Sequence, residues 1–301
     1  MRHVLSVSDW SKDDIHWILD RASEWKKSAT CSATVKRRPQ AVLILERPSL
    51  RTRMAYEGAF HLLHGVLTVF EGGVGTSDSV GDVSRVLSEM LDLAIIRTRN
   101  HEKLEQIAAT ATIPVINALS DREHPVEVLA DALVMREQFT QPQGRRIAFV
   151  GDGGNVCASL LLLAPLMGMS ASVACPEGYF PDQAILERSR ESARLHGTEL
   201  MVTADVIDAV SDAAVVYTDG WPTFDTQDMQ EGVFGSFRVT EQLMKRAAPD
   251  AIFLHCLPAT RGAEVTDGVL DSAQSFAFRR LKNLVFTSAA MIEWALGGDM
   301  L

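Results

Sequence analysis

Short runs of apolar, β-branched residues alternate along the whole chain with amphipathic stretches. This alternation is typical of βα units, which place helices on both faces of a parallel sheet. Because both faces of each strand are then covered, the sequence predicts buried, nearly continuously apolar strands. The expected strands are 41–46, 66–70, 93–97, 114–119, 146–151, 171–175, 199–202, 213–217 and 251–254.

The expected helices lie between these strands, at 52–64, 82–91, 102–109, 125–138, 155–167, 182–195 and 283–296. The segment Thr140–Gly144 contains Pro142 and Gly144 and breaks the pattern after the helix at 125–138. A length of 301 residues favours two domains. We therefore expect an α/β protein with two doubly wound parallel-sheet domains joined by interdomain helices. The first domain is predicted at 1–133, completed by the C-terminal helix at 283–301, and the second at 134–282.

Composition excludes several classes of protein. The net charge of −10 argues against general binding of nucleic acid, because phosphate backbones are held by basic surfaces. Four separated cysteines without a CxxC pair predict neither a zinc site nor a disulfide framework. The sequence contains no apolar run long enough to span a membrane and no secretory signal at its start, so a cytoplasmic location is expected. The Gly- and Ser-rich stretch Glu71–Ser79 predicts a mobile loop.

The segment Pro48–Arg53 stands where the strand at 41–46 leads into a helix. Backbone amides at a helix start attract anions, and a hydroxyl with a guanidinium group completes a phosphate cradle. Arg51 is the strongest candidate for a phosphate ligand. The alternative is that Ser49 only caps the helix and the arginines form a solvated face.

Two further motifs follow strands. His124-Pro125 heads the helix at 125–138, at the carboxyl end of the parallel sheet where α/β proteins gather ligands, although a single histidine is often a capping or core residue. Gly151-Asp152-Gly153-Gly154-Asn155 is a glycine-rich turn. It lacks the complete G-x-G-x-x-G spacing because position 156 is valine, so a dinucleotide-binding dehydrogenase is a poor interpretation.

The last motif, His255-Cys256-Leu257-Pro258, leaves the strand at 251–254. A Cys/His nucleophilic pair is one interpretation. However, adjacent residues of an extended segment point to opposite faces, so a direct dyad is not expected.

Taken in order over nearly the whole chain, these motifs resemble the aspartate/ornithine carbamoyltransferase family, and His255–Pro258 resembles its ornithine branch. The resemblance implies a carbamoyl-phosphate domain at 1–133, an amino-acid domain at 134–282, and a cytoplasmic homotrimer whose sites lie at subunit interfaces. Its partners are carbamoyl phosphate and a small amino-acid-like acceptor, with no nucleic acid, no membrane, and neither metal nor organic cofactor.

The resemblance also implies the site residues. The catalytic residues are Thr52, Arg97, His124 and Cys256, of which Thr52, Arg97 and His124 stabilise the carbonyl oxygen. The remaining substrate-binding residues are Ser49, Leu50, Arg51, Glu127, Asn155, Asp219, Thr223, Phe224, Leu257 and Leu284.

Three departures from the family pattern bear on the substrate. Glu127 replaces a glutamine, Leu284 replaces an arginine that donates to the carbonyl oxygen, and Phe224 replaces a methionine after Asp219. The change after Asp219 predicts a noncanonical acceptor, such as a shorter diamino acid or a modified ornithine. Two alternatives stay open: a catalytically silent ligand-binding or regulatory subunit, and a transferred amidino group, whose nitrogen would face Glu127.

Overall fold

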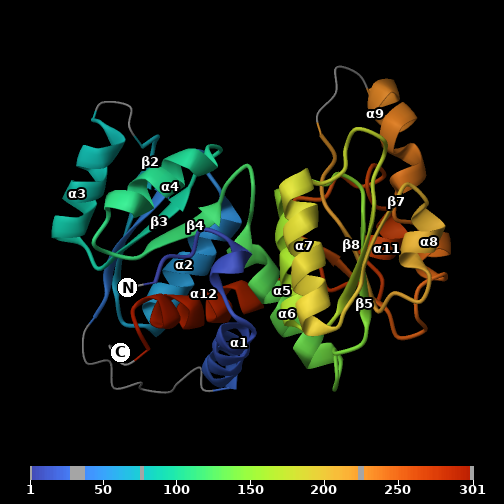
Figure 1. The fold of residues 1–301 in the computed structure, drawn as a ribbon, viewed down its shortest axis with the longest axis horizontal. Coiled ribbons are helices and arrows are strands. Elements are labelled where there is room, and N and C mark those ends of the chain that lie inside the picture. The colour runs from blue at the N-terminus through green and yellow to red at the C-terminus, as the bar shows by residue number, and fades with distance from the viewer. Residues whose placement is uncertain (1, 28–37, 75–77, 223–226, 299–301) are drawn as a thin grey trace. The chain divides into compact units, whose positions relative to one another are not determined.

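The computed structural model describes residues 2–27, 38–74, 78–222 and 227–298. The chain forms two compact units, Met1–Leu133 with Leu281–Leu301, and Val134–Arg280. Each unit contains one parallel sheet with helices on both faces (Figure 1). The predicted α/β class with two doubly wound sheets is therefore confirmed. Helix α5 (Pro125–Gln138) begins in the first unit and ends in the second.

The sheet of the first unit has the strand order β2-β1-β3-β4. Its strands are β1 (Gln40–Leu45), β2 (Val66–Glu71), β3 (Leu93–Arg97) and β4 (Val115–Leu119). On one face, side chains of β1 and β3 pack against α4 (His101–Thr110), with α3 (Val80–Met90) beside it. Figure 1 shows α1 (Lys12–Lys27), α2 (Leu50–Leu62) and α12 (Leu281–Ala295) grouped on the opposite face.

The sheet of the second unit has the order β7-β6-β5-β8-β9. Its strands are β5 (Arg146–Val150), β6 (Ser170–Ala174), β7 (Leu200–Thr203), β8 (Val215–Thr218) and β9 (Ile252–His255). Helices α6 (Asn155–Leu166) and α7 (Gln183–His196) pack together beside β6 and β7. A separate core cluster joins the sheet to α8 (Val206–Val210), α10 (Glu241–Met244) and α11 (Asp267–Leu270). Helix α9 (Gln227–Phe234) and the short 3-10 helices η1 (Val7–Asp9) and η2 (Gly235–Phe237) complete the elements.

The expectation that every strand is buried is wrong for β2 and β7, one edge strand of each sheet. Val66 and Phe70 of β2 are 57% and 52% exposed, and β7 is only partly covered. An edge strand has a strand neighbour on one side only, so less of it is shielded. The other two edge strands, β4 and β9, are buried, and each has an isolated bridge to another segment, Ile116 to Val4 and Phe253 to Ser275.

The last helix begins at Leu281, two residues before the predicted start, and ends at Ala295. Of the predicted loop Glu71–Ser79, residues 75–77 lie outside the described residues. Among the helices that the structure describes, none is long and apolar enough to cross a lipid bilayer.

Candidate active site

The predicted phosphate cradle lies at the N-terminus of α2. Ser49 is the N-cap, its Oγ accepting from the Thr52 backbone N–H at 3.4 Å, and the same hydroxyl lies 2.9 Å from Thr52 Oγ1. Ser49 therefore caps the helix, as the alternative interpretation predicted. The remaining backbone amides of the first turn point out of the helix start, where they can bind an anion. Leu50, the first helical residue, has a 75% exposed side chain, so its expected contribution is its backbone N–H.

The two arginines of this motif differ. Arg53 is exposed and forms ion pairs with Glu57 at 2.8 Å and Glu71 at 3.4 Å, which is the solvated-face behaviour expected by the alternative interpretation. Arg51 is half-buried, and within the described ranges no hydrogen bond or ion pair engages its guanidinium group. Arg51 is therefore the cation at this helix start that is available to an anionic ligand.

Arg97 ends β3 and lies beside this helix start. Its Nη1 donates to Thr52 Oγ1 at 3.2 Å, so Thr52 accepts from Arg97 while it is also in contact with Ser49. The buried Thr52 hydroxyl thus links the cradle to the carboxyl end of the sheet. The structure brings these three sequence-predicted residues together.

His124 and Glu127 form a second cluster of the first unit, at the start of α5. Their Nε2 and Oε2 atoms are 3.1 Å apart, and both side chains are buried. Burial, and then the charge of Glu127, raise the pKa of the Tyr56 phenol above its ordinary value. The Tyr56 hydroxyl is buried, and in the described part of the chain it has no hydrogen-bond partner. The sequence analysis missed Tyr56, which lies four residues after Thr52 on α2 and thus on the same helix face.

Leu284 lies in a small apolar cluster with Ala55 of α2 and Ala130 of α5. It is 3% exposed, so its side chain fills space between three helices. Two arginines directly precede α12: Arg279 lies over the Phe276 ring at 5.2 Å, and Arg280 is completely buried. Leucine has no side-chain hydrogen-bond donor, so the donors predicted for the carbonyl oxygen in the first unit are Thr52, Arg97 and His124.

The predicted acceptor residues of the second unit gather at the carboxyl edge of its sheet. Asn155 is the first residue of α6 after the glycine-rich turn, and Asp219 directly follows β8. Asp219 Oδ1 accepts from the Cys256 thiol at 2.6 Å and from the Gly220 backbone N–H at 2.7 Å. The structure thus places Cys256 and Asp219, which were predicted separately as site residues, in direct contact.

The glycine-rich turn has a steric reason for two of its glycines. Gly151 has φ of +129°, a conformation that side chains disfavour, and a Cβ at Gly153 would overlap the Pro181 backbone. These glycines let the turn pass close to neighbouring backbone and so fix Asp152 at the sheet edge.

His255 and Cys256 do not act on each other directly. His255 is fully buried, with Nε2 at 3.2 Å from Glu264 Oε1 and Nδ1 accepting from the Leu257 backbone N–H at 2.8 Å. Because Nδ1 accepts, the ring proton lies on Nε2, which donates to Glu264. Leu257 has φ of +60°, so this buried pair holds a strained turn that presents Cys256.

The same atoms decide how the cluster of Asp219, His255 and Cys256 is interpreted. Their ligand-type atoms lie within 4.8 Å of one another. Both imidazole nitrogens and the thiol already have protein partners, so we interpret the cluster as a hydrogen-bonded network rather than a metal centre.

Asp152 is the acidic neighbour that the motif analysis did not select. Burial raises its pKa to about 6, and the charge of Asp219 contributes to the same shift. Behind it lie two buried thiols: burial raises the pKa of Cys175 to about 12 and that of Cys157 well above its ordinary value. These thiols are inert at neutral pH.

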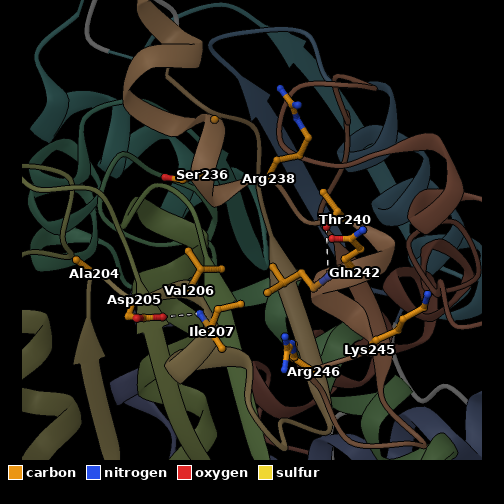
Figure 2. Close-up of a pocket in the computed structure, with 12 residues that line it drawn as sticks. Ala204, Asp205, Val206, Ile207, Ser236, Arg238, Thr240, Gln242, Lys245 and Arg246 are labelled. Carbon is orange, nitrogen blue, oxygen red and sulfur yellow. Dashed lines mark hydrogen bonds between the residues drawn. The ribbon is translucent and has the colours of Figure 1, made fainter.

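Two predicted residues, Thr223 and Phe224, lie outside the described residues. A separate hollow of about 780 Å³ on the second unit contains none of the predicted site residues (Figure 2). It is lined by residues of α8, of η2 and of the segment that includes α10, among them Asp205, Ile207, Arg238, Lys245 and Arg246.

Comparison with known proteins agrees with this division into two sites. The model of the family "Aspartate/ornithine carbamoyltransferase, carbamoyl-P binding domain" matches residues 2–137, and that of the family's "Asp/Orn binding domain" matches residues 143–295.

Curated relatives match over nearly their full length. An ornithine carbamoyltransferase of Anoxybacillus flavithermus is 38% identical, with 97% of this chain and 95% of the relative covered. One from Methanothermobacter thermautotrophicus is also 38% identical, with 99% of both chains covered.

Solved structures give the same result. Ornithine carbamoyltransferase from Pyrococcus furiosus aligns with a TM-score of 0.95 at 33% identity, covering 99% of this chain and 97% of that one. The enzyme from Gloeobacter violaceus aligns with a TM-score of 0.90 at 35% identity, covering 98% of each chain. The chain therefore belongs to the aspartate/ornithine carbamoyltransferase family.

Proposed function

We propose that this protein transfers the carbamoyl group of carbamoyl phosphate to the amine of an ornithine-like or other diamino-acid acceptor and releases phosphate. The observation that carries the proposal is the helix start of α2, where an unengaged Arg51 stands beside Ser49 and Thr52. Oriented amides, hydroxyls and a guanidinium group suit the doubly charged leaving phosphate. The curated relatives are named as enzymes, which favours catalysis over a silent regulatory subunit.

In the proposed mechanism each domain holds one substrate. Residues 1–133 with the C-terminal helix bind carbamoyl phosphate: Ser49, Arg51 and the Leu50 amide hold phosphate, and Thr52, Arg97 and His124 donate to the carbonyl oxygen as negative charge develops. The carboxylate of Glu127, beside His124, accepts from the carbamoyl NH2. Leu284 limits the pocket without donating a hydrogen bond.

Residues 134–282 bind the acceptor in this proposal. Asn155 and Asp219 hold its polar groups, and Cys256 with the Leu257 turn positions the amine; Thr223 and Phe224 complete the side-chain pocket. The neutral amine attacks the carbamoyl carbon, the C–O bond to phosphate breaks, and the amine loses one proton. Neither metal nor organic cofactor takes part in this scheme.

A panel of amines tests the activity and the acceptor. Purified protein with carbamoyl phosphate is assayed for phosphate release with ornithine, a hydroxylated ornithine, 2,4-diaminobutyrate, 2,3-diaminopropionate, lysine and aspartate. We expect a diamino acid to accelerate release, and a shorter or modified one to exceed ornithine, because the segment after Asp219 departs from the ornithine pattern. A clear preference for ornithine would defeat the noncanonical acceptor, and no acceleration by any amine would defeat the transferase.

The proposal also includes a homotrimer with sites at subunit interfaces. Exposed apolar side chains on α2 and the edge strand β2 support an association surface near the cradle: Leu50, Met54, Val66 and Phe70 are all more than half exposed. We expect light scattering after size exclusion to give the mass of three 33.0 kDa chains. Charged substitutions at Met54 and Phe70 should lower that mass to one chain; a monomeric parent protein would contradict the proposal.

A further inference from the structure

Three neighbouring strands of the second unit end beside one another. Strand β5 pairs with β8 through Phe149 and Tyr217, and β8 pairs with β9 through Thr218 and His255. The residues that follow these strand ends, Asp152, Asp219 and Cys256, therefore occupy adjacent positions at the carboxyl edge. Two carboxylates and a thiol thus face the same space.

These two carboxylates differ in what already binds them. Asp219 accepts hydrogen bonds from Cys256 and from the Gly220 amide. For Asp152, no hydrogen-bond donor or cation is found anywhere in the described ranges, and its ionisable neighbours are Asp219 and the thiols Cys157 and Cys175. A half-buried carboxylate beside a second carboxylate is stabilised by a proton or by a bound cation.

A second observation points to a ligand at this edge. The indole of Trp221 is 8% exposed, and its N–H is buried without an acceptor among the residues that the structure describes. The indole nitrogen lies 3.5 Å from the position that a Cβ would take on Gly151, the residue before Asp152. Stacking on Phe234, with centroids 5.3 Å apart, fixes the ring. A donor without an acceptor in the described residues thus lies beside Gly151, the residue that precedes Asp152.

We propose that Asp152 binds the reacting ammonium group of the acceptor and takes its proton, while the Trp221 N–H donates to an acceptor atom of the same substrate. This inference deepens the proposed carbamoyl transfer and rests on it. One N–H bond of the ammonium breaks and the proton passes to an Asp152 oxygen. The freed lone pair forms the N–C bond to the carbamoyl carbon, the C–O electrons leave with phosphate, and the second proton of the nitrogen passes to the departing phosphate.

The environment of Asp152 suits this task. With a pKa near 6, its carboxyl group is ionised at neutral pH yet more basic than an ordinary aspartate. The carboxylate of Asp219 lies beside it and favours a cation in the shared space. The buried thiols Cys157 and Cys175 stay protonated, so they do not compete for the proton.

The pH dependence of Asp152→Asn is the decisive measurement. In the parent protein, kcat/KM for the acceptor should rise with pH through a limb near 6, where Asp152 ionises. The variant has to capture an amine that is already neutral, so the limb should move toward the amine's own pKa of about 10. At pH 7 we expect kcat/KM to fall by about 10²-fold, a typical contribution of a general base.

Two matched variants separate this role from a structural one. Asp212→Asn changes an exposed aspartate of the same unit, with φ of 56° that asparagine also adopts, and should leave rate and pH limb unchanged. Trp221→Phe removes only the N–H and should raise KM for the acceptor about 10-fold, with kcat and the melting temperature nearly unchanged. An unchanged acid limb in Asp152→Asn, with the parent active, would overturn the inference and leave the proposed function standing.

Binding provides a readout that does not need turnover. The acceptor found in the amine panel, or ornithine and 2,3-diaminopropionate if no amine is carbamoylated, is titrated calorimetrically into both proteins. Binding by the parent that weakens at least 10-fold in Asp152→Asn supports the ammonium site even in an inactive protein. Equal binding by the two proteins, or none by the parent, would refute it.

Discussion

Replacing Arg51 with alanine should lower the rate of carbamoyl transfer by about 10³-fold, the upper end of what one preorganised donor contributes. The guanidinium group of Arg51 stands half-buried at the start of α2 with no protein partner in the described part of the chain. In the proposed function, its charge and its fork of donors therefore bind the leaving phosphate. Calorimetric titration with inorganic phosphate and with a phosphonate analogue of carbamoyl phosphate should show the same loss of binding.

Arg53→Ala is the matched control. Arg53 lies one half-turn further along the same helix, but its guanidinium group is exposed and paired with Glu57 and Glu71. Its removal should change the rate only a few-fold, because surface ion pairs contribute little. Equal losses of rate in the two variants would indicate that the positive charge acts at long range rather than by direct contact with the phosphate. Unchanged anion affinity in Arg51→Ala would exclude this cradle as the phosphate site.

Replacing Glu293 with alanine should cost about 3–5 kcal/mol of unfolding free energy, as removal of one partner from a buried ion pair does. Glu293 of α12 is 2% exposed. It accepts from Arg21 Nε and Nη2 at 2.7 and 2.9 Å and from the Trp25 indole at 2.9 Å, both on α1. The variant leaves a buried indole N–H and a partly buried guanidinium group without their acceptor. Urea denaturation of the parent and the variant measures this loss of unfolding free energy, provided that the two proteins have the same m-value.

Glu24→Ala provides the comparison, because Glu24 binds the same arginine from the exposed side, at 2.8 Å. We expect a change below about 1 kcal/mol for this surface pair. A similar loss of unfolding free energy in both variants would contradict this prediction. The buried hydrogen bonds to Glu293 would then stabilise the fold no more than the exposed ion pair of Arg21 with Glu24 does.

The strands and most long helices are predictable from the sequence because their burial leaves a visible pattern. Strand β3 and helix α5 have the expected bounds, since Leu93–Ile96 and the helix after Pro125 are almost wholly buried. The exposure of Val66 was missed because apolar residues of an edge strand look like those of an inner one. Helix α1 was not predicted although Ile15, Ile18, Leu19 and Trp25 form a buried stripe at helical spacing.

The candidate site was predictable where a motif lies at a strand end, because backbone topology alone then places the residue. Ser49, Arg97, Asp219 and Cys256 belong to this class. Partners supplied by distant segments gave no local signal: Tyr56 approaches Glu127 across two helices, and Glu264 holds His255 from the following loop. Asp152 was overlooked because a sequence does not show that a carboxylate has no hydrogen-bond donor or cation, as is the case for Asp152 in the described part of the chain.

The division of the chain also has a consequence for its synthesis. The first unit includes Leu281–Leu301, yet the ribosome makes these residues only after the entire second unit. Until then the apolar surfaces of α1 and α2 that later contact α12 have no cover. The N-terminal part of the nascent polypeptide therefore stays incompletely folded while the second unit can already fold. A premature stop codon shortly before residue 281 should yield an aggregation-prone fragment.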